Sequence, residues 1–263
     1  MRRIAIMAAS GRELAPARAA LGNIRDGRLH AFRHEVGDTG ALEAHLIETG
    51  IGPVAAYSAA RAALDVLAVD AVVSTGYAGA LGPAGIGELV MGTEVLNWTK
   101  EKPRTRLRTD PVLLVMARKT AGVAGTAWSQ GSLVTVDNIM WRASEKQALG
   151  RVSGAIAVDM ESAAIAQAAG ERGAPFLLVR AVSDRADEDL PMDFNLWFTP
   201  WGRVHGAVQI LLHPSILRSL LLMKRHVGQG SQNLARFFKT FFVVLAEGHL
   251  PADALTVTTM GAH

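Results

Sequence analysis

Small polar residues and carboxylates gather in four short segments, of which three end a predicted strand and the fourth follows the first strand. The segments are residues 10–13, 74–79, 158–162 and 180–184. Ligands of α/β sheets bind in the crevice beyond the carboxyl ends of the strands, so we expect the four segments to meet at one pocket. Their acids Glu13, Glu161 and Asp184 have the residue type that moves protons and stabilises a developing positive charge.

Each segment, taken alone, also has a simpler structural explanation. The glycine-rich segment could merely connect a strand to a helix, and Glu13 could begin a surface helix. Asp159 and Glu161 could meet the positive end of a following helix dipole. Ser183 and Asp184 could cap the next element. The occurrence of all four segments together, in this order, is what favours a shared functional site.

The elements that must position these segments alternate between short apolar runs and longer helical patterns. Strands are predicted at residues 4–8, 29–36, 44–49, 71–75, 89–97, 127–136 and 176–182, and helices at 54–66, 111–120 and 162–172. Such alternation favours an α/β layered domain with a largely parallel or mixed sheet.

The composition of the chain excludes several classes of function. At 263 residues, of which 49% are hydrophobic and 19% charged, the chain can bury one large core and does not resemble a disordered protein. The net charge of +3 and the lack of a dense basic run with aromatics give no sign of a nucleic-acid partner. Because there is no cysteine, a disulfide scaffold, a thiolate zinc site and a cysteine nucleophile are excluded.

The N-terminus superficially resembles a signal peptide, since two arginines precede an apolar run. Polar residues 10–13 interrupt that run too early for the apolar region of a signal. No window reaches the roughly 18 uncharged apolar residues of a spanning helix. We therefore expect a first core strand here and a cytoplasmic protein.

The last third of the sequence has a different character. We predict a single domain over residues 1–263, with residues 201–245 as an apolar helical C-terminal extension broken at Pro214. The extension contains two predicted helices, 216–225 and 233–245. They carry Leu217, Leu220, Leu221, Leu222, Phe237, Phe238, Phe241 and Phe242, together with Arg218, Lys224, Arg225, Arg236 and Lys239. Two interpretations stay open: the helices cover one face of the sheet, or they form a lid or a lipid-facing surface with peripheral contact to the inner membrane.

Three motifs in order carry a resemblance to a known family. They are Gly-Tyr-Ala-Gly-Ala-Leu at 76–81, Val-Asp-Met-Glu-Ser-Ala-Ala at 158–164 and Val-Arg-Ala-Val-Ser-Asp-Arg-Ala-Asp at 179–187. Over residues 3–187 the chain resembles the superfamily of purine nucleoside phosphorylases and methylthioadenosine nucleosidases. The resemblance implies a three-layer α/β/α fold around a mixed, partly closed sheet. It also implies cleavage of an N-ribosidic bond to release a purine, and a homo-oligomer.

The resemblance also assigns roles to individual residues. Asp184 would give a proton or hydrogen bond to N7 of the departing purine, and Glu161 would bind the ribose hydroxyls with Met160 against the sugar. Further substrate-binding or supporting positions are Ser183, Arg180, Ser74, Thr75, Gly76, Ala78, Gly79, Val134 and Thr135. The ribosyl group leaves through a cationic state, so a protonated Asp184 and an ionised Glu161 suit the chemistry. No metal or other cofactor is required.

The nucleophile is open between water and phosphate. The phosphorylase branch of the superfamily typically supplies arginines to phosphate, whereas this chain offers only Arg12 and backbone amides near the first strand and Ser74 before the glycine turn. Glu13 falls where the hydrolytic branch keeps the glutamate that activates water. We therefore favour hydrolysis. The base loop at 131–137 departs from the adenine-specific pattern and offers the purine an aliphatic surface.

The chain looks most like the hopanoid-associated phosphorylase subfamily. This resemblance rests on residues 183–191, on Trp201-Gly202-Arg203 and on the apolar C-terminal helices. That resemblance implies removal of adenine from adenosylhopane, a nucleoside with a large apolar 5′ group. Alternatives are phosphorolysis of the same substrate, a methylthioadenosine and adenosylhomocysteine nucleosidase, or a non-catalytic nucleoside or lipid carrier. The three acids argue against a carrier, which needs no acid.

Overall fold

The computed structural model describes residues 2–27, 29, 32–99, 105–198 and 214–247, and within them it contains one sheet of ten strands. The strands are β1 (Arg2–Ala8), β2 (Gly22–Asp26), β3 (His34–Asp38), β4 (Leu42–Glu48), β5 (Ala71–Ala80), β6 (Leu89–Asn97), β7 (Arg106–Arg108), β8 (Trp128–Thr135), β9 (Ala157–Asp159) and β10 (Phe176–Asp184). Their order is β10-β6-β8-β9-β5-β1-β4-β3-β2, with β7 paired to β6.

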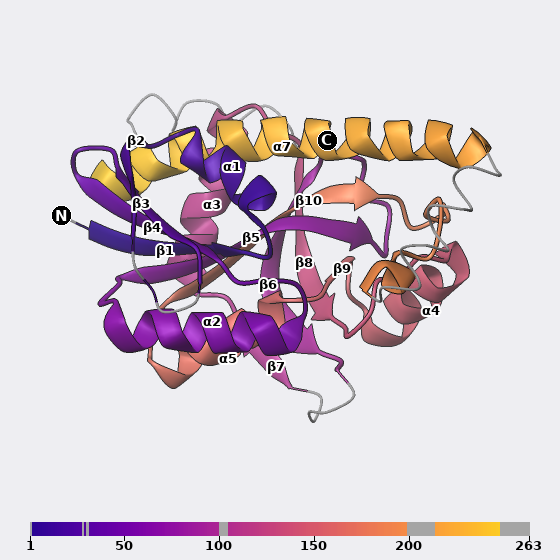
Figure 1. The fold of residues 1–263 in the computed structure, drawn as a ribbon, viewed down its shortest axis with the longest axis horizontal. Coiled ribbons are helices and arrows are strands. Elements are labelled where there is room, and N and C mark those ends of the chain that lie inside the picture. Colours follow the sequence, from indigo (N-terminus) through magenta and orange to yellow (C-terminus); the bar gives the residue numbers. More distant parts are fainter. Residues whose placement is uncertain (1, 28, 30–31, 100–104, 199–213, 248–263) are drawn as a thin grey trace, which may run out of the picture.

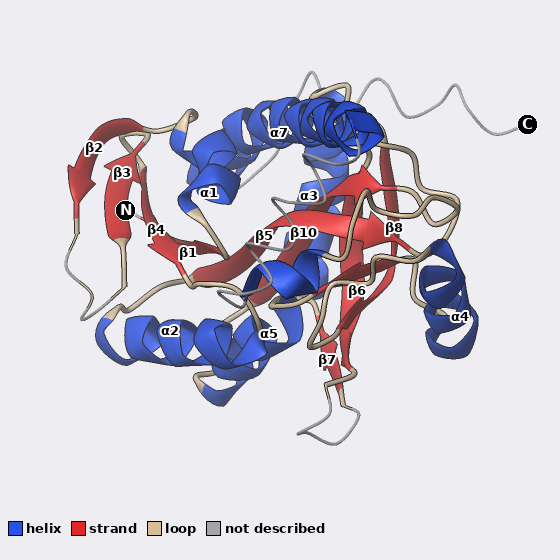
Figure 2. Cartoon of the chain, turned by 45° about the vertical axis from the view of Figure 1, so that its right-hand side comes forward, coloured by secondary structure: helices blue, strands red, loops and turns tan. Residues whose placement is uncertain are grey.

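One end of the sheet closes on itself. Strand β10 pairs in parallel with β5 and antiparallel with β6, so β5, β10, β6, β8 and β9 form a ring (Figure 2). Strands β1, β4, β3 and β2 continue from β5 as an open extension. The predicted mixed, partly closed sheet is confirmed.

Helices cover the two faces of the sheet (Figure 1). On one face lie α1 (Gly11–Arg18), α3 (Pro111–Val123) and α7 (Pro214–Glu247), and on the other α2 (Pro53–Val66) and α5 (Ser162–Glu171). Helix α4 (Ala143–Ser153) and the short 3-10 helix η1 (Phe194–Phe198) lie toward the closed end of the sheet. The layers therefore follow the predicted α/β/α order.

Local sequence explains where several of these helices begin. Helix α2 is alanine-rich, and Pro53 occupies its first turn, where a missing N–H costs nothing. The Asp110 side chain accepts hydrogen bonds from two backbone N–H groups of α3, which is an N-terminal cap. All nine residues of β10 are buried, as expected for a strand covered on both faces.

The C-terminal extension differs from the prediction of two helices. The described part, from Pro214, is one continuous helix, α7, and residues 201–213 lie outside the described residues. Gly230 lies in the middle of α7, where a Cβ atom would lie 3.0 Å from the Cβ of Ala181 on β10. The glycine therefore allows close packing of α7 on the sheet and does not end a helix.

The four phenylalanines of α7 belong to the core. Phe237, Phe238, Phe241 and Phe242 are fully buried against the sheet and against α1 and α3. Their burial contributes roughly 2–3 kcal/mol for each ring, so this half of α7 is a structural layer. The lipid-facing interpretation is wrong for these residues. In the part of the chain that the structure describes, no helix has the length and apolarity to cross a bilayer.

The prediction of a strand at residues 29–36 was also wrong in its bounds. The strands are β2 at Gly22–Asp26 and β3 at His34–Asp38, and Leu29 and Phe32 form only an isolated bridge between them. Because β2 has exposed side chains and lies at the edge of the sheet, it carries little of the apolar signal that marks a strand.

Candidate active site

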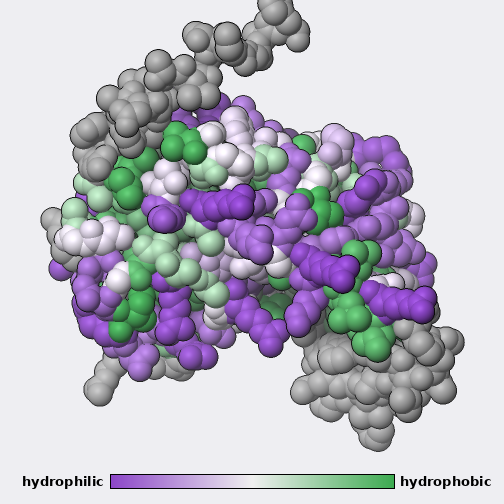
Figure 3. Space-filling model, turned by 90° about the horizontal axis from the view of Figure 1, so that it is seen from above, coloured by the Kyte–Doolittle hydropathy of each residue, from purple (hydrophilic) through white to green (hydrophobic). Residues whose placement is uncertain are grey.

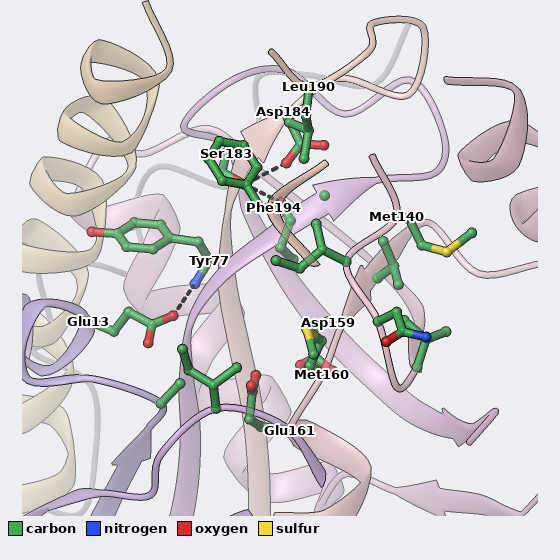
Figure 4. Close-up of a pocket in the computed structure, with 18 of the residues that line it drawn as sticks. Glu13, Tyr77, Met140, Asp159, Met160, Glu161, Ser183, Asp184, Leu190 and Phe194 are labelled. Atoms are coloured by element: carbon green, nitrogen blue, oxygen red, sulfur yellow. Dashed lines mark hydrogen bonds between the residues drawn. The ribbon is translucent and has the colours of Figure 1, made fainter. Parts of the chain in front are cut away.

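A cavity of about 500 Å³ lies where the polar segments meet, at one end of the closed part of the sheet (Figure 4). Helix α1, which follows β1, and the ends of β5 and β10 contribute to its wall, as the topology rule predicts. Strand β9 departs from that rule, since it runs antiparallel to β5 and places Val158 opposite Gly79. The residues that follow β9 reach the cavity because this strand is only three residues long.

Asp184 ends β10 on one side of the cavity and is almost fully buried. Its Oδ1 accepts a hydrogen bond of 2.7 Å from the Ser183 hydroxyl, and its Oδ2 lies 2.8 Å from the ammonium of Lys146. Gly79 packs so closely that a Cβ atom there would lie 3.0 Å from Oδ2. The carboxylate is thus fixed from three sides and still borders the cavity.

Glu13 lies across the cavity from Asp184, on the first turns of α1 (Figure 4). Its Oε2 accepts a hydrogen bond of 3.0 Å from the Ser10 hydroxyl, and its Oε1 accepts one of 3.3 Å from the backbone N–H of Tyr77. These two hydrogen bonds use only part of the acceptor capacity of the carboxylate, so Glu13 can accept further hydrogen bonds from a molecule in the cavity. The Tyr77 ring extends toward α7, and burial raises the pKa of its hydroxyl.

Glu161 lies at a third position on the cavity wall, next to Met160. Its Oε1 accepts a hydrogen bond of 2.9 Å from the backbone N–H of Gly52. Burial raises the pKa of Glu161 to about 7, against the opposing effect of the nearby Arg180 guanidinium. This acid therefore changes charge near neutral pH.

Arg180 is fully buried beneath the cavity and belongs to a hydrogen-bonded network. Its guanidinium bridges Asp159, the carbonyl of Thr75 and the hydroxyls of Ser74 and Ser162. The N–O distance of the ion pair with Asp159 is 2.9 Å. These contacts hold β5, β10 and the start of α5 together at the edge of the site.

The glycine-rich segment is part of β5, which continues to Ala80, so the prediction that this strand ends at residue 75 in a glycine turn is wrong. Two features explain why the residue in the middle of the strand is Gly76. Its φ of +133° lies in a region that other residues rarely adopt. A Cβ atom here would lie 2.4 Å from a guanidinium nitrogen of Arg180 and 2.5 Å from Oε1 of Glu13. The absent side chain therefore lets the arginine network approach the cavity carboxylate.

The structure divides the site residues of the sequence analysis into three groups. Those that line the cavity are Glu13, Ala78, Gly79, Met160, Glu161, Ser183 and Asp184. Those that support it from behind are Ser74, Thr75, Gly76 and Arg180. Val134 and Thr135 lie elsewhere: Val134 is in a separate apolar cluster, and the Thr135 hydroxyl donates to Asp159 at 2.6 Å and borders a second cavity.

Sequence reasoning missed several residues that border or contact the site. Lys146 contacts Asp184 from α4, a helix that the sequence analysis did not predict. Apolar wall residues come from loops, from η1 and from α7: Ile51, Ile139, Met140, Leu190, Phe194, Leu220 and Met223. The spacing of Leu220 and Met223 is the one usable signal, since residues three apart share a helix face.

The arginines near the site are not available as hydrogen-bond donors to a phosphate in the cavity. Arg12 is exposed and does not line the cavity, and Arg180 is fully engaged in its own network. Among the described residues that line the cavity there is no arginine or lysine. The wall offers carboxylates and apolar side chains, which suit a neutral or cationic reacting group.

The comparisons with known proteins agree with this architecture. The sequence model of the phosphorylase superfamily matches residues 3–207. A 5′-methylthioadenosine/S-adenosylhomocysteine nucleosidase of Chromohalobacter salexigens is 30% identical over 226 residues, covering 80% of this chain and 95% of the relative. The corresponding nucleosidase of Shewanella baltica is 28% identical over 225 residues, with the same coverage of both chains.

Solved structures show the same fold. The nucleosidase of Neisseria meningitidis in complex with methylthio-immucillin-A gives a TM-score of 0.71 at 24% identity, covering 92% of this chain and 98% of that one. A futalosine hydrolase mutant of Helicobacter pylori gives 0.73 at 19% identity, with coverages of 92% and 98%. The family match and the nucleosidase relatives thus define an enzyme class that cleaves N-glycosidic bonds. This chain belongs to the phosphorylase superfamily.

Proposed function

We propose that this protein hydrolyses the N-ribosidic bond of an adenine nucleoside that carries a large apolar 5′ group, and that adenosylhopane is its substrate. The observation that carries the proposal is the placement of Glu13, Glu161 and Asp184 around one largely apolar cavity. Adenine and a ribosyl hopane are the products of this reaction, which places the enzyme in hopanoid biosynthesis.

Each acid has a role that follows from its position. Asp184 delivers a proton to N7 of the purine, so the base leaves as a neutral molecule. Glu161 binds the ribose hydroxyls and stabilises the cationic sugar, and Met160 packs against the sugar. Glu13, on the opposite side from Asp184, takes a proton from the attacking water. The supporting residues Ser183 and Arg180 keep these groups in place.

Water is favoured over phosphate as the nucleophile. A phosphate dianion requires cationic or N–H donors, and Arg12 is exposed while Arg180 is bound to Asp159, Ser74 and Ser162. A carboxylate at Glu13 would also repel an anion, whereas it accepts the proton of a water molecule.

The apolar part of the cavity wall favours a substrate with an apolar 5′ substituent. Leu220 and Met223 of α7 line the cavity, and Leu217 and Leu221 on the adjoining surface of the same helix are 51% and 55% exposed. Apolar side chains of α7 therefore occur both in the cavity wall and on the exposed surface of the helix, and a polycyclic hydrocarbon would gain about 25 cal/mol per Å² of apolar area buried against them.

The relatives favour a second candidate within the same class. The curated relatives act on 5′-methylthioadenosine and S-adenosylhomocysteine, and they cover most of this chain. A nucleosidase for these compact substrates would use the same three acids. It would have no use for the exposed leucines of α7.

The test compares 5′-alkylthioadenosines of increasing chain length, with adenine release as the readout. Each added methylene that is buried should contribute about 0.8 kcal/mol of binding free energy. Because every 1.4 kcal/mol is a factor of about ten, kcat/KM should rise steadily over several methylenes. Leu220→Ser should flatten this rise and leave the methylthio substrate nearly unaffected. A kcat/KM that is highest for the methylthio group would favour the second candidate.

A further inference from the structure

The buried residue of helix α4 is a lysine, which is the reverse of ordinary helix patterning. Within Ala143–Ser153, all of which the structure describes, Lys146 is the residue whose side chain is buried, and its exposed fraction is 0%. Burying an ammonium is costly without a charged partner, so this position is not explained by packing alone.

The partner of Lys146 is the acid of the proposed reaction. Its Nζ lies 2.8 Å from Oδ2 of Asp184 and also donates to the backbone carbonyl of Arg185. The Ser183 hydroxyl occupies Oδ1 at 2.7 Å. A carboxylate oxygen accepts two hydrogen bonds, so Oδ2 can bind Lys146 and still face the cavity.

This arrangement raises a question about the source of the proton. Asp184 faces an ammonium group at hydrogen-bond distance, which is the environment of an ionised carboxylate. A purine that leaves from C1′ needs a proton at N7 as the bond to N9 breaks. The ammonium of Lys146, in direct contact with Asp184, holds a proton of this kind.

We propose that Lys146 is a positioning residue that also supplies the proton which Asp184 passes to the purine. The inference rests on the proposed function. As the C1′–N9 bond breaks and its electron pair moves to the base, Lys146 Nζ gives a proton to Asp184 Oδ2, and Oδ2 passes a proton to N7. This leaves a neutral amine beside the ionised carboxylate. Water forms the new bond to C1′ and gives its proton to Glu13. Glu13 then releases that proton to solvent, and solvent returns a proton to Lys146 to complete the cycle.

The test uses two leaving groups with the same 5′-substituted ribose. Adenine needs a proton to leave, whereas 4-nitrophenolate leaves without one. For Lys146→Gln we expect kcat with the adenine nucleoside to fall by about 10²-fold or more, the scale of lost acid catalysis, with little change in KM. With the nitrophenyl riboside we expect kcat to stay close to that of the unmodified enzyme. Lys119→Gln, an exposed lysine on α3, is the matched control and should behave as the unmodified enzyme with both substrates.

A second variant separates proton supply from charge pairing. Lys146→Arg keeps the positive charge beside Asp184, but a guanidinium does not release its proton. We expect kcat for the adenine nucleoside to stay low in this variant. Recovery of kcat with arginine, or an equal loss with both leaving groups in Lys146→Gln, would overturn the proposal. This variant also keeps the question testable if Lys146→Gln does not fold.

A double variant shows whether Lys146 acts through Asp184. If it does, adding Lys146→Gln to Asp184→Asn should cause no further loss in kcat for the adenine nucleoside. Additive losses would contradict the inference. Full activity of Asp184→Asn alone would instead refute the role of Asp184 in the proposed function, so the two failures are distinguishable.

Discussion

At the scale of the residue, the site contains carboxylates in very different surroundings. Asp184 faces an ammonium, Glu13 faces a hydroxyl and a backbone N–H, and Glu161 is buried with one backbone donor. Differences of this kind let acids of the same type perform different steps. The surroundings of Glu161 have a consequence for stability, because burial raises its pKa to about 7.

The raised pKa of Glu161 predicts a pH-dependent cost to stability. In the unfolded chain this acid ionises near its ordinary value of 4.5, and in the folded protein near 7, so the folded state binds more protons between these values. Its contribution to the free energy of unfolding therefore falls as pH rises through this window. We measure the free energy of unfolding by urea for Glu161→Gln and for the unmodified protein. The advantage of the variant in this free energy should be about 2–3 kcal/mol larger at pH 8 than at pH 5.

The matched control for this measurement is Glu171→Gln. Glu171 is on α5, and its pKa is lowered, first by the hydrogen bond from Gln167 and then by that from Tyr57. Its replacement should give no gain at pH 8. An equal gain for both variants, or a Glu161→Gln curve parallel to that of the unmodified protein, would show that burial does not raise the pKa of Glu161.

Sequence motifs located Glu13, Glu161 and Asp184, because acids at strand ends are visible as local patterns. Lys146 was not predictable in this way. A single lysine in a polar helix has the pattern of a surface residue, and only the tertiary packing of α4 brings it to Asp184. The roles of all these residues stay predictions until the variants are measured.

At the scale of the element, α7 divides into two halves with different surroundings. The C-terminal half is buried through its phenylalanines, while Leu217, Leu221 and Leu222 near its beginning are about half exposed. Arg218, Lys224 and Arg225 lie among them and are exposed. Figure 3, which looks down on this face of the molecule, shows apolar side chains beside charged ones at its right-hand end.

This mixed surface predicts a peripheral contact with anionic lipid. The leucines can enter the acyl region while the basic side chains meet the headgroups, at about 1 kcal/mol for each of them. We expect the intact chain to co-sediment with anionic vesicles, and added salt to weaken this binding. The double variant Leu217→Ser with Leu221→Ser should release the protein and preserve cleavage of a methylthio substrate.

The control for this surface lies on the same helix. Val243 is 43% exposed at the other end of α7, so Val243→Ser should bind vesicles like the unmodified chain. Failure of the intact protein to bind vesicles would refute the membrane contact, as would binding that the leucine variant leaves unchanged. Phe237 and Phe241 are unsuitable for this test because they belong to the core.

The elements themselves were predictable to different degrees. Strand β10 was found near its observed bounds. For β5 the start was found, but the strand continues to Ala80 through the segment that was predicted to be a glycine turn. The continuity of α7 was not predicted, because glycines in a sequence indicate the end of a helix. The close approach of α7 to Ala181 explains why residue 230 is a glycine. Edge strand β2 was missed because its side chains are mostly exposed.

At the scale of the whole molecule, the alternation of strands and helices predicted the layers, and the family resemblance implied the partly closed sheet. Alternation alone could not have given the closure, because it depends on β10 pairing with both β5 and β6, which are contacts between distant parts of the chain. The closure matters for function, since it brings the ends of β5, β9 and β10 to one cavity. A homo-oligomer remains a prediction of the resemblance.

The measurement that tests the central claim most directly is the identity of the ribosyl product. A 5′-alkylthioadenosine is incubated with the enzyme in phosphate-free buffer and with saturating phosphate, and the products are separated and identified by mass. We predict adenine and the free alkylthioribose at the same rate in both buffers. Glu13→Gln should lower that rate by about 10²- to 10⁴-fold, since an amide cannot accept the proton of water. A strict requirement for phosphate, a ribosyl 1-phosphate product and an unaffected Glu13→Gln variant would contradict the account.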